Sequence, residues 1–195
     1  GGRQTGIRLY RNDVGKFTDV TSQAGLVSPI GYAFAGVFAD YDNDGCLDLF
    51  LSNDPDSRTR TLNSVLYHSN CNGTFSDVTQ KSGINNRYHG RGASFADYDN
   101  DGFLDLYLTN QGNYNGPREY LYEPNVLYHN NRDGTFSDVT LQSGATGFIG
   151  DECAPKIDLK YRITVNGLGV KASLQPIWFD YNRDRLIDLF IATDS

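Results

Sequence analysis

At residues 38–50 the chain reads FADYDNDGCLDLF, and at residues 95–107 it reads FADYDNDGFLDLY. A weaker copy, FDYNRDRLIDLF, occupies residues 179–190. In each copy, an acidic loop lies between two short stretches in which apolar residues alternate with polar ones, a pattern typical of β-strands. The repeated stretch therefore predicts a β-hairpin whose connecting loop carries clustered carboxylates.

A second repeated stretch alternates with the first. It reads LYRNDVGKFTDVT at residues 9–21, LYHSNCNGTFSDVT at residues 66–79 and LYHNNRDGTFSDVT at residues 127–140. Short runs rich in Tyr, Phe, Val and Thr flank a turn, which indicates a second hairpin. The expected turns each contain a glycine: Val14-Gly15, Asn72-Gly73 and Asp133-Gly134.

The spacing of these repeats indicates a repeat architecture. Phe17, Phe75 and Phe136 hold the same place in the second hairpin and lie 58 and 61 residues apart. A period of this size is typical of arrays and propellers, and two hairpins make the four-stranded blade of a propeller. We therefore predict an all-β fold of four-stranded antiparallel β-propeller blades, about three in number.

We expect one repeat array over residues 1–195. It divides into a half-blade at 7–25 (second hairpin), complete blades at 32–84 and 90–145, an insertion at 146–175 and a half-blade at 176–195 (first hairpin). The two half-blades are complementary, and a propeller needs roughly four blades to close. Two completions stay open: the rest of a longer propeller, or a second copy bound head to tail, which gives a ring or a filament.

The acidic loops follow the pattern Asp-x-Asp-x-Asp-Gly-x-x-Asp. Calcium takes six to eight oxygen ligands, and closely spaced aspartates on a tight loop supply them. We expect the aspartate side chains and one backbone carbonyl to bind Ca²⁺ in each full loop: Asp40, Asp42, Asp44 and Asp48 with the carbonyl of Cys46, and Asp97, Asp99, Asp101 and Asp105 with that of Phe103. The EF-hand alternative fails, because its position 12 requires a carboxylate and Leu51 and Leu108 stand there.

The third loop departs from the pattern. Its candidate ligands are Asp180, Asn182, Asp184 and Asp188. It has lost one charge and the glycine, and it has gained Arg183 and Arg185. We expect weaker calcium binding here or none, with the Arg185 side chain as an alternative internal cation. The sequence thus predicts two calcium sites and leaves the third open.

The acidity of the chain is concentrated in these loops. The formal net charge is −7, and 11 of the 24 acidic residues lie in the three loops; without them the remaining charge would be +4. The chain has no basic stripe, so we expect no nucleic-acid partner. It also lacks an apolar run long enough to span a bilayer, and it carries no metalloprotease, nucleotide-binding or nucleophile-elbow motif. We therefore expect no enzyme.

Cysteine and histidine residues complete the set of candidates. Of the three cysteines, Cys46 and Cys71 are the favoured disulfide pair because both lie in one repeat. His68 and His129 share one repeat position and are interpreted as structural strand residues, whereas His89 occurs in one repeat and its role stays open. The pattern Asn72-Gly73-Thr74 fits a glycosylation acceptor and equally fits a turn.

Aromatic residues and the first residues of the chain give two weaker expectations. The tyrosines of residues 110–125 and Trp178 suit packing or, less readily, stacking on a sugar. The chain contains no Met and starts Gly1-Gly2-Arg3-Gln4 without an apolar leader, so we expect a processed product or a segment of something longer.

These motifs resemble the FG-GAP/VCBS repeat superfamily, which includes the integrin α-subunit propeller and the ASPIC/UnbV-associated repeats. The resemblance covers nearly the whole chain except residues 147–175, and it implies calcium at the matched aspartates and an extracellular or cell-surface location. We expect a calcium-stabilised module for adhesion or self-assembly, with itself, the rest of a propeller, a glycan or a protein as partner. The alternatives are a carbohydrate-binding, lectin-like propeller and a non-catalytic fragment of a polysaccharide-acting enzyme.

Overall fold

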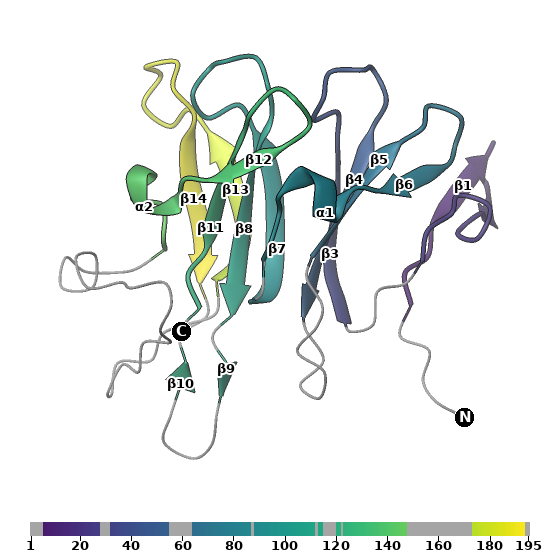
Figure 1. The fold of residues 1–195 in the computed structure, drawn as a ribbon, viewed down its shortest axis with the longest axis horizontal. Coiled ribbons are helices and arrows are strands. Elements are labelled where there is room, and N and C mark those ends of the chain that lie inside the picture. Colours follow the sequence, from purple (N-terminus) through teal and green to yellow (C-terminus); the bar gives the residue numbers. More distant parts are fainter. Residues whose placement is uncertain are drawn as a thin grey trace.

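The computed structural model describes residues 6–27, 32–54, 64–86, 88–111, 113–114, 120–121, 123–147 and 173–193. Over these residues the fold is all-β, with strands joined by turns and with two helices of one turn each. Antiparallel sheets lie side by side along the molecule (Figure 1). Within the described part of the chain, no helix has the length and apolarity needed to cross a membrane.

Two complete blades form the centre of the molecule. The first contains β3 (Tyr32–Ala39), β4 (Asp48–Asp54), β5 (Val65–Ser69) and β6 (Phe75–Asp77), paired in that order. The second contains β7 (His89–Ala96), β8 (Asp105–Gln111), β11 (Val126–Asn130) and β12 (Phe136–Asp138), again with neighbours in chain order. The predicted blade of two hairpins and four antiparallel strands is confirmed.

Two-stranded hairpins flank the blades. β1 (Tyr10–Asp13) pairs with β2 (Lys16–Asp19), and β13 (Ser173–Phe179) pairs with β14 (Asp188–Thr193). The two hairpins lie at opposite ends of the array (Figure 1). β13 begins inside the range that the sequence pattern assigns to the insertion, and residues 148–172 of that insertion lie outside the described residues.

The turns of the second hairpins agree only in part with the turns predicted from the sequence. Val14 and Gly15 form a two-residue turn with φ of 54° and 90°, as the sequence predicts. The connection between β5 and β6 is longer than expected, because Ser69 pairs with Phe75 and five residues lie between them. An additional ladder, β9 (Asn113–Tyr114) with β10 (Tyr120–Leu121), lies in the segment expected to be a loop.

Two short helices follow the second hairpins, and the strand pattern did not predict them. They are α1 (Thr79–Ser82) and α2 (Thr140–Ser143). Asp77 Oδ1 accepts a hydrogen bond from the Thr79 N–H at 3.0 Å, and Asp138 does the same for Thr140. This local bond turns the chain out of the strand direction, because an Asp side chain can replace a backbone partner at a turn.

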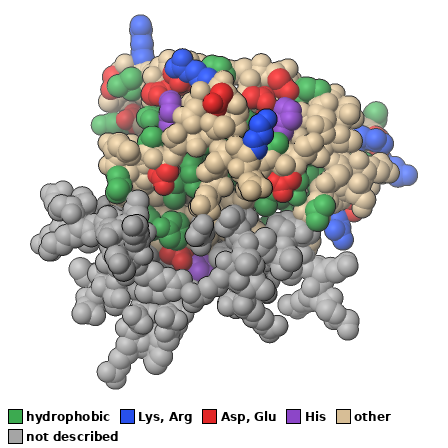
Figure 2. Space-filling view, in the orientation of Figure 1, with side chains coloured by type: hydrophobic (Ala, Val, Ile, Leu, Met, Phe, Trp, Pro, Cys, Tyr) green, Lys and Arg blue, Asp and Glu red, His purple; other side chains and the backbone are tan. Residues whose placement is uncertain are grey.

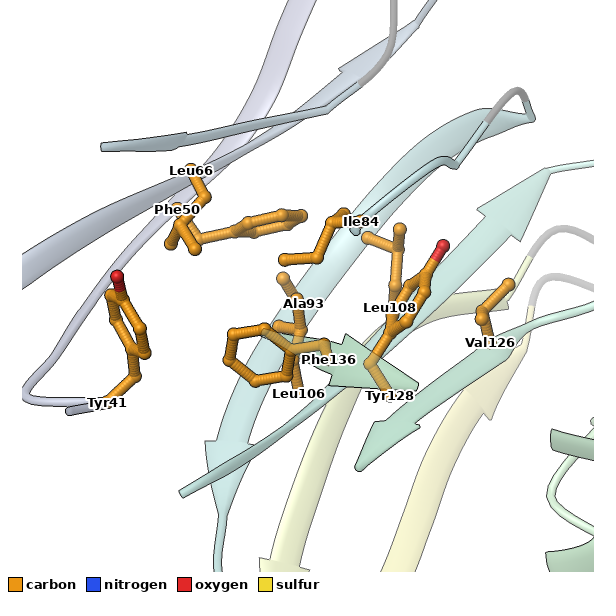
Figure 3. Packing of buried hydrophobic residues seen from close by; sticks show 10 residues of the cluster. All are labelled: Tyr41, Phe50, Leu66, Ile84, Ala93, Leu106, Leu108, Val126, Tyr128 and Phe136. Carbon is orange, nitrogen blue, oxygen red and sulfur yellow. The ribbon is translucent and has the colours of Figure 1, made fainter. Parts of the chain in front are cut away.

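The core lies between the blades rather than inside one of them. Phe50 and Leu66 of the first blade face Leu106, Leu108 and Tyr128 of the second (Figure 3). The neighbours of Phe50 in β4 point the other way and pack in a second cluster near the β1–β2 hairpin. Strands such as β4 are therefore buried on both faces, and this stacking brings the acidic loops to one edge of the molecule.

Candidate calcium-binding loops

The β3–β4 connection folds around the carboxylate of Asp40. Its two oxygens accept hydrogen bonds from the N–H groups of Asp44 and Gly45, both at 3.0 Å. The Cys46 N–H donates to Asp44 Oδ1 at 2.8 Å. Gly45 has φ of 88°, a left-handed conformation that favours glycine and permits the tight turn. The first aspartate of the motif thus shapes the loop.

The β7–β8 connection has the same geometry. The N–H groups of Asp101 and Gly102 donate to Asp97 at 2.8 and 2.9 Å, and the Phe103 N–H donates to Asp101 Oδ1 at 2.9 Å. Two loops 57 residues apart therefore share one hydrogen-bond scheme. A shared scheme is expected when one motif is repeated in one structural context.

The predicted ligands converge in both loops. Groups of carboxylate oxygens lie within 4.8 Å of one another, drawn from Asp40, Asp42 and Asp44 in the first loop and from Asp97, Asp99 and Asp105 in the second. Acidic side chains and histidines gather near the upper edge of the molecule in the space-filling view (Figure 2). The motif therefore places several hard oxygen donors in one small volume, as a calcium ion requires.

The last aspartate of each loop links it to the next hairpin. Asp48 and Asp105 are almost fully buried. Asp48 Oδ1 accepts a hydrogen bond from the Ser69 N–H at 2.8 Å, and Asp105 Oδ1 accepts one from the Asn130 N–H at 2.8 Å. Each loop is therefore tied to the third strand of its own blade.

The two full loops also contact each other. The Asn43 side-chain amide in the first loop donates to the Gly102 carbonyl in the second at 3.0 Å. The Asn130 amide of β11 donates to the Tyr41 carbonyl at 2.8 Å. These bonds cross the junction between the two blades and link the two loops directly.

Two histidines contact the carboxylates, and the sequence interpretation missed this. His68 Nδ1 lies 3.2 Å from Asp42 and 3.1 Å from Asp48. His129 Nδ1 lies 3.3 Å from Asp99 and 3.2 Å from Asp105, although without the angles of a hydrogen bond. The available signal was that His68 and His129 hold the same repeat position, after Leu-Tyr, in the two blades that carry the full acidic loops.

The electrostatics of the loops fit a bound cation. Asp42 Oδ1 is buried and has no hydrogen-bond partner. Burial, and then the charge of Asp44, raises the pKa of Asp42 above its usual value. Burial raises the pKa of Asp105 to about 6. Carboxylates that lack solvation and lie beside one another are stabilised in their charged form by a nearby cation. The residues present therefore fit Ca²⁺.

The third loop keeps the backbone hydrogen bonds of the other two loops but not their cluster of carboxylates. Asp180 accepts hydrogen bonds from the N–H groups of Asp184 and Arg185 at 3.1 and 2.9 Å, as in the other loops. Arg185 has φ of 74° where the other loops have glycine. Asn182 donates to Asp184 Oδ2 at 2.9 Å, which occupies one of the carboxylate oxygens.

The side chains of the third loop do not converge as those of the other two do. Its remaining candidate ligand, Asp188, accepts a hydrogen bond from the Tyr181 N–H at 3.0 Å. Among the described residues, its carboxylates form no group of three that could hold a metal. Arg185 makes no ion pair within 4.0 Å of them in this part of the chain, so the structure gives no support to Arg185 as an internal cation.

The cysteine prediction is confirmed by a disulfide between Cys46 and Cys71. It joins the acidic loop of the first blade to the β5–β6 turn. Asn72 lies in that turn and accepts hydrogen bonds from the N–H and hydroxyl of Thr74. Asn72 therefore stabilises the turn through its side chain, and its glycosylation stays a prediction.

His89 and Trp178 make their contacts with residues outside the acidic loops. His89 begins β7, and its Nδ1 lies 2.8 Å from Glu123 while its Nε2 lies 3.6 Å from Asp54. Trp178 packs edge-on against Tyr107, with ring centroids 5.9 Å apart. This contact agrees with a packing role for Trp178, which the sequence favours over stacking on a sugar.

Comparison with known proteins agrees with the fold and the loops. Residues 1–51 and 52–108 each match the FG-GAP-like repeat family, which together is more than half of the chain. The chain belongs to this family, and its four-stranded sheets are consistent with propeller blades.

Two relatives carry the name Cartilage acidic protein 1. The protein from Xenopus tropicalis is 30% identical over 101 residues, which are 51% of this chain and 14% of that protein. The protein from Mus musculus is 43% identical over 60 residues, or 30% of this chain and 9% of that protein. The chain thus matches a small part of the length of either relative.

Proposed function

We propose that this chain is a calcium-stabilised extracellular repeat module that acts in adhesion or assembly, without catalysis. The observation that carries the proposal is the convergence of carboxylate oxygens from Asp40, Asp42 and Asp44, together with the burial of Asp42 Oδ1 without a hydrogen-bond partner. Ca²⁺ satisfies such a donor set, with Asp48 and the carbonyl of Cys46 completing it. The equivalent residues of the second loop form the second site.

Calcium bound in these loops would hold the blades together. Each loop is hydrogen-bonded to the third strand of its blade, and Asn43 links the first loop to the Gly102 carbonyl of the second. A ligand that binds the folded state alone stabilises it by about 2.7 kcal/mol at a hundredfold excess over Kd. Extracellular calcium modules have affinities of roughly 10⁻⁴–10⁻³ M, which match the calcium concentration outside cells.

Two observations support the extracellular location. The Cys46–Cys71 disulfide belongs to the class of bonds that persist in oxidising compartments and are rare in the cytosol. The two relatives are named for cartilage and for acidity. The carbohydrate-binding alternative depends on residues 110–125 and 147–175, most of which lie outside the described residues, so no contact favours it.

Thermal unfolding in calcium and in excess EGTA tests the proposal. We expect a higher melting temperature in calcium, with little effect of equimolar magnesium, because Mg²⁺ gives up its water less readily. The double variant Asp42→Asn/Asp99→Asn should lose the calcium-dependent shift. Asp133→Asn is a matched control, since it removes a carboxylate from the β11–β12 turn, where the β5–β6 turn already has Asn72. An unchanged melting temperature in EGTA would refute the calcium role.

A further inference from the structure

The two full acidic loops hold the third aspartate of their pattern by the same backbone bond. Asp44 Oδ1 accepts a hydrogen bond from the Cys46 N–H at 2.8 Å, and Asp101 Oδ1 accepts one from the Phe103 N–H at 2.9 Å. Each loop therefore orients this carboxylate through its own backbone. The difference between the loops lies at the other carboxylate oxygen, Oδ2.

In the second loop, the side chain of Arg132 occupies Asp101 Oδ2. Its Nε and Nη2 atoms donate hydrogen bonds to this oxygen at 2.9 and 2.8 Å. Cys71 takes the same repeat position in the first blade, and its disulfide to Cys46 brings no charge to the first loop. One loop thus carries a cation of its own on a predicted calcium ligand, whereas the other loop carries an uncharged link.

The carboxylate clusters differ at the same aspartate. Asp44 lies in one group with the first two aspartates of its loop, with oxygens within 4.8 Å of one another. In the second loop, the group around the first two aspartates includes Asp105, whereas Asp101 groups with Asp99 and His129. Among the described residues, no such group combines Asp101 with both of the first two aspartates of its loop. The third aspartate therefore converges on the first two only in the loop without an arginine.

A calcium ion in the second loop has to share the Asp101 carboxylate with Arg132 or displace the guanidinium. Two cations on one carboxylate repel each other, and giving up the ion pair costs free energy. The affinity of an aspartate-rich loop for Ca²⁺ depends on the charge of its ligands, which Arg132 reduces. The histidines do not produce this difference, since His68 and His129 lie against corresponding aspartates of their loops.

We propose that Arg132 competes with calcium for Asp101, so that the first loop fills at a lower calcium concentration than the second. This inference rests on the calcium role proposed above and concerns the regulation of the same two sites. The chain then responds to calcium in two steps. The second step releases or weakens the bond between the β11–β12 turn and its acidic loop, because Arg132 belongs to that turn.

A calcium titration followed by two-dimensional NMR of the full chain measures the two loops separately. The Gly45 and Gly102 N–H groups each donate to the first aspartate of their own loop, at 3.0 and 2.9 Å, so their amide signals report on that loop. We expect the Gly45 signal to reach its midpoint at a calcium concentration roughly 10-fold below that of Gly102, a difference typical of residues that contact metal ligands. Equal midpoints, or the reverse order, would overturn the proposal.

Removing the guanidinium should tighten the second site. Arg132→Gln should lower the Gly102 midpoint roughly 10-fold and change the Gly45 midpoint much less. Arg11→Gln is the matched control, because Arg11 donates two hydrogen bonds to Asp13 outside the acidic loops, and it should change neither midpoint. A Gly102 midpoint that stays in place or rises in Arg132→Gln would contradict competition by Arg132.

The arginine can also be transplanted into the first blade. Cys46→Phe/Cys71→Arg gives the first loop and its turn the residues of the second blade, and Cys46→Ser/Cys71→Ser is its control, because both variants lack the disulfide. The Gly45 midpoint should be higher in the arginine variant than in the serine variant, and equal midpoints would count against the proposal.

The number of calcium ions bound separates this inference from the calcium role itself. Calorimetry of the wild type should show two. Binding to neither loop would refute the calcium role and the competition together. Two bound ions with equal NMR midpoints would reject the competition and leave the calcium role in place.

Discussion

Cys71 in the first complete blade and Arg132 in the second hold the same position, with left-handed φ of 57° and 65°, and each fastens its turn to the acidic loop. Cys71 does so through its disulfide to Cys46. Arg132 donates two hydrogen bonds to Asp101, at 2.9 and 2.8 Å, and lies 5.9 Å from the ring centroid of Phe103. The two blades therefore use different chemistry for one connection, covalent in one and ionic in the other.

Removing the disulfide should destabilise the first blade. Cys46→Ser/Cys71→Ser should lower the free energy of unfolding by about 3 kcal/mol, because the bond closes a loop with a sequence separation of 25. Urea denaturation in calcium measures the loss. Reducing agent should lower the stability of the wild type and leave the double variant unchanged; equal sensitivity of the two would contradict the role of this bond.

The third loop should become a calcium site when its pattern is restored. Asn182→Asp/Arg185→Gly returns the missing carboxylate and places glycine where φ is 74°. Calorimetric titration should show one more calcium per chain than the wild type binds. Arg185→Gly alone should keep the wild-type number, since it adds no ligand. If the double variant binds no additional calcium, the pattern is not sufficient for a site.

Close packing of β13 on β7 should make Gly92 intolerant of a side chain. A Cβ at this position would collide with the Leu174 carbonyl and lie 2.9 Å from Pro176 Cδ. Gly92→Ala should therefore lower the free energy of unfolding by roughly 1–3 kcal/mol. Gly36→Ala is the control, because its Cβ would meet a methyl group of Leu51 at 3.3 Å, which can move. Equal effects in denaturant titrations would contradict the tight junction.

The pair of His89 and Glu123 should make stability depend on pH. The hydrogen bond to Glu123 raises the pKa of His89, and burial opposes the shift. A raised folded-state pKa stabilises the fold below the unfolded value of about 6.5, and this contribution disappears as pH rises through the folded value. Glu123→Gln should therefore cost more stability at pH 6 than at pH 9. In a His89→Gln background, Glu123→Gln should cost about the same stability at both pH values. If Glu123→Gln costs the same at pH 6 and pH 9 in the wild-type background, the pair does not make stability depend on pH.

The blade architecture could be predicted from the sequence because the same strand, loop and turn motifs occur in both complete blades. The FADYDNDG stretches fix strand, loop and strand, and Gly45 and Gly102 take the left-handed φ that the motif implies. What could not be predicted depends on contacts between repeats. His68 reaches Asp42 across the blade, and Asn43 reaches Gly102 across a junction, so neither contact is visible in the linear pattern.

A crystal structure of the protein grown in calcium, with anomalous differences recorded, tests the central claim most directly. We predict one strong peak among Asp40, Asp42 and Asp44 and one among Asp97, Asp99 and Asp105, each within 2.3–2.6 Å of the carboxylate oxygens. Maps in which Asp42 and Asp99 turn toward solvent, with no peak between them and their neighbours, would contradict the account.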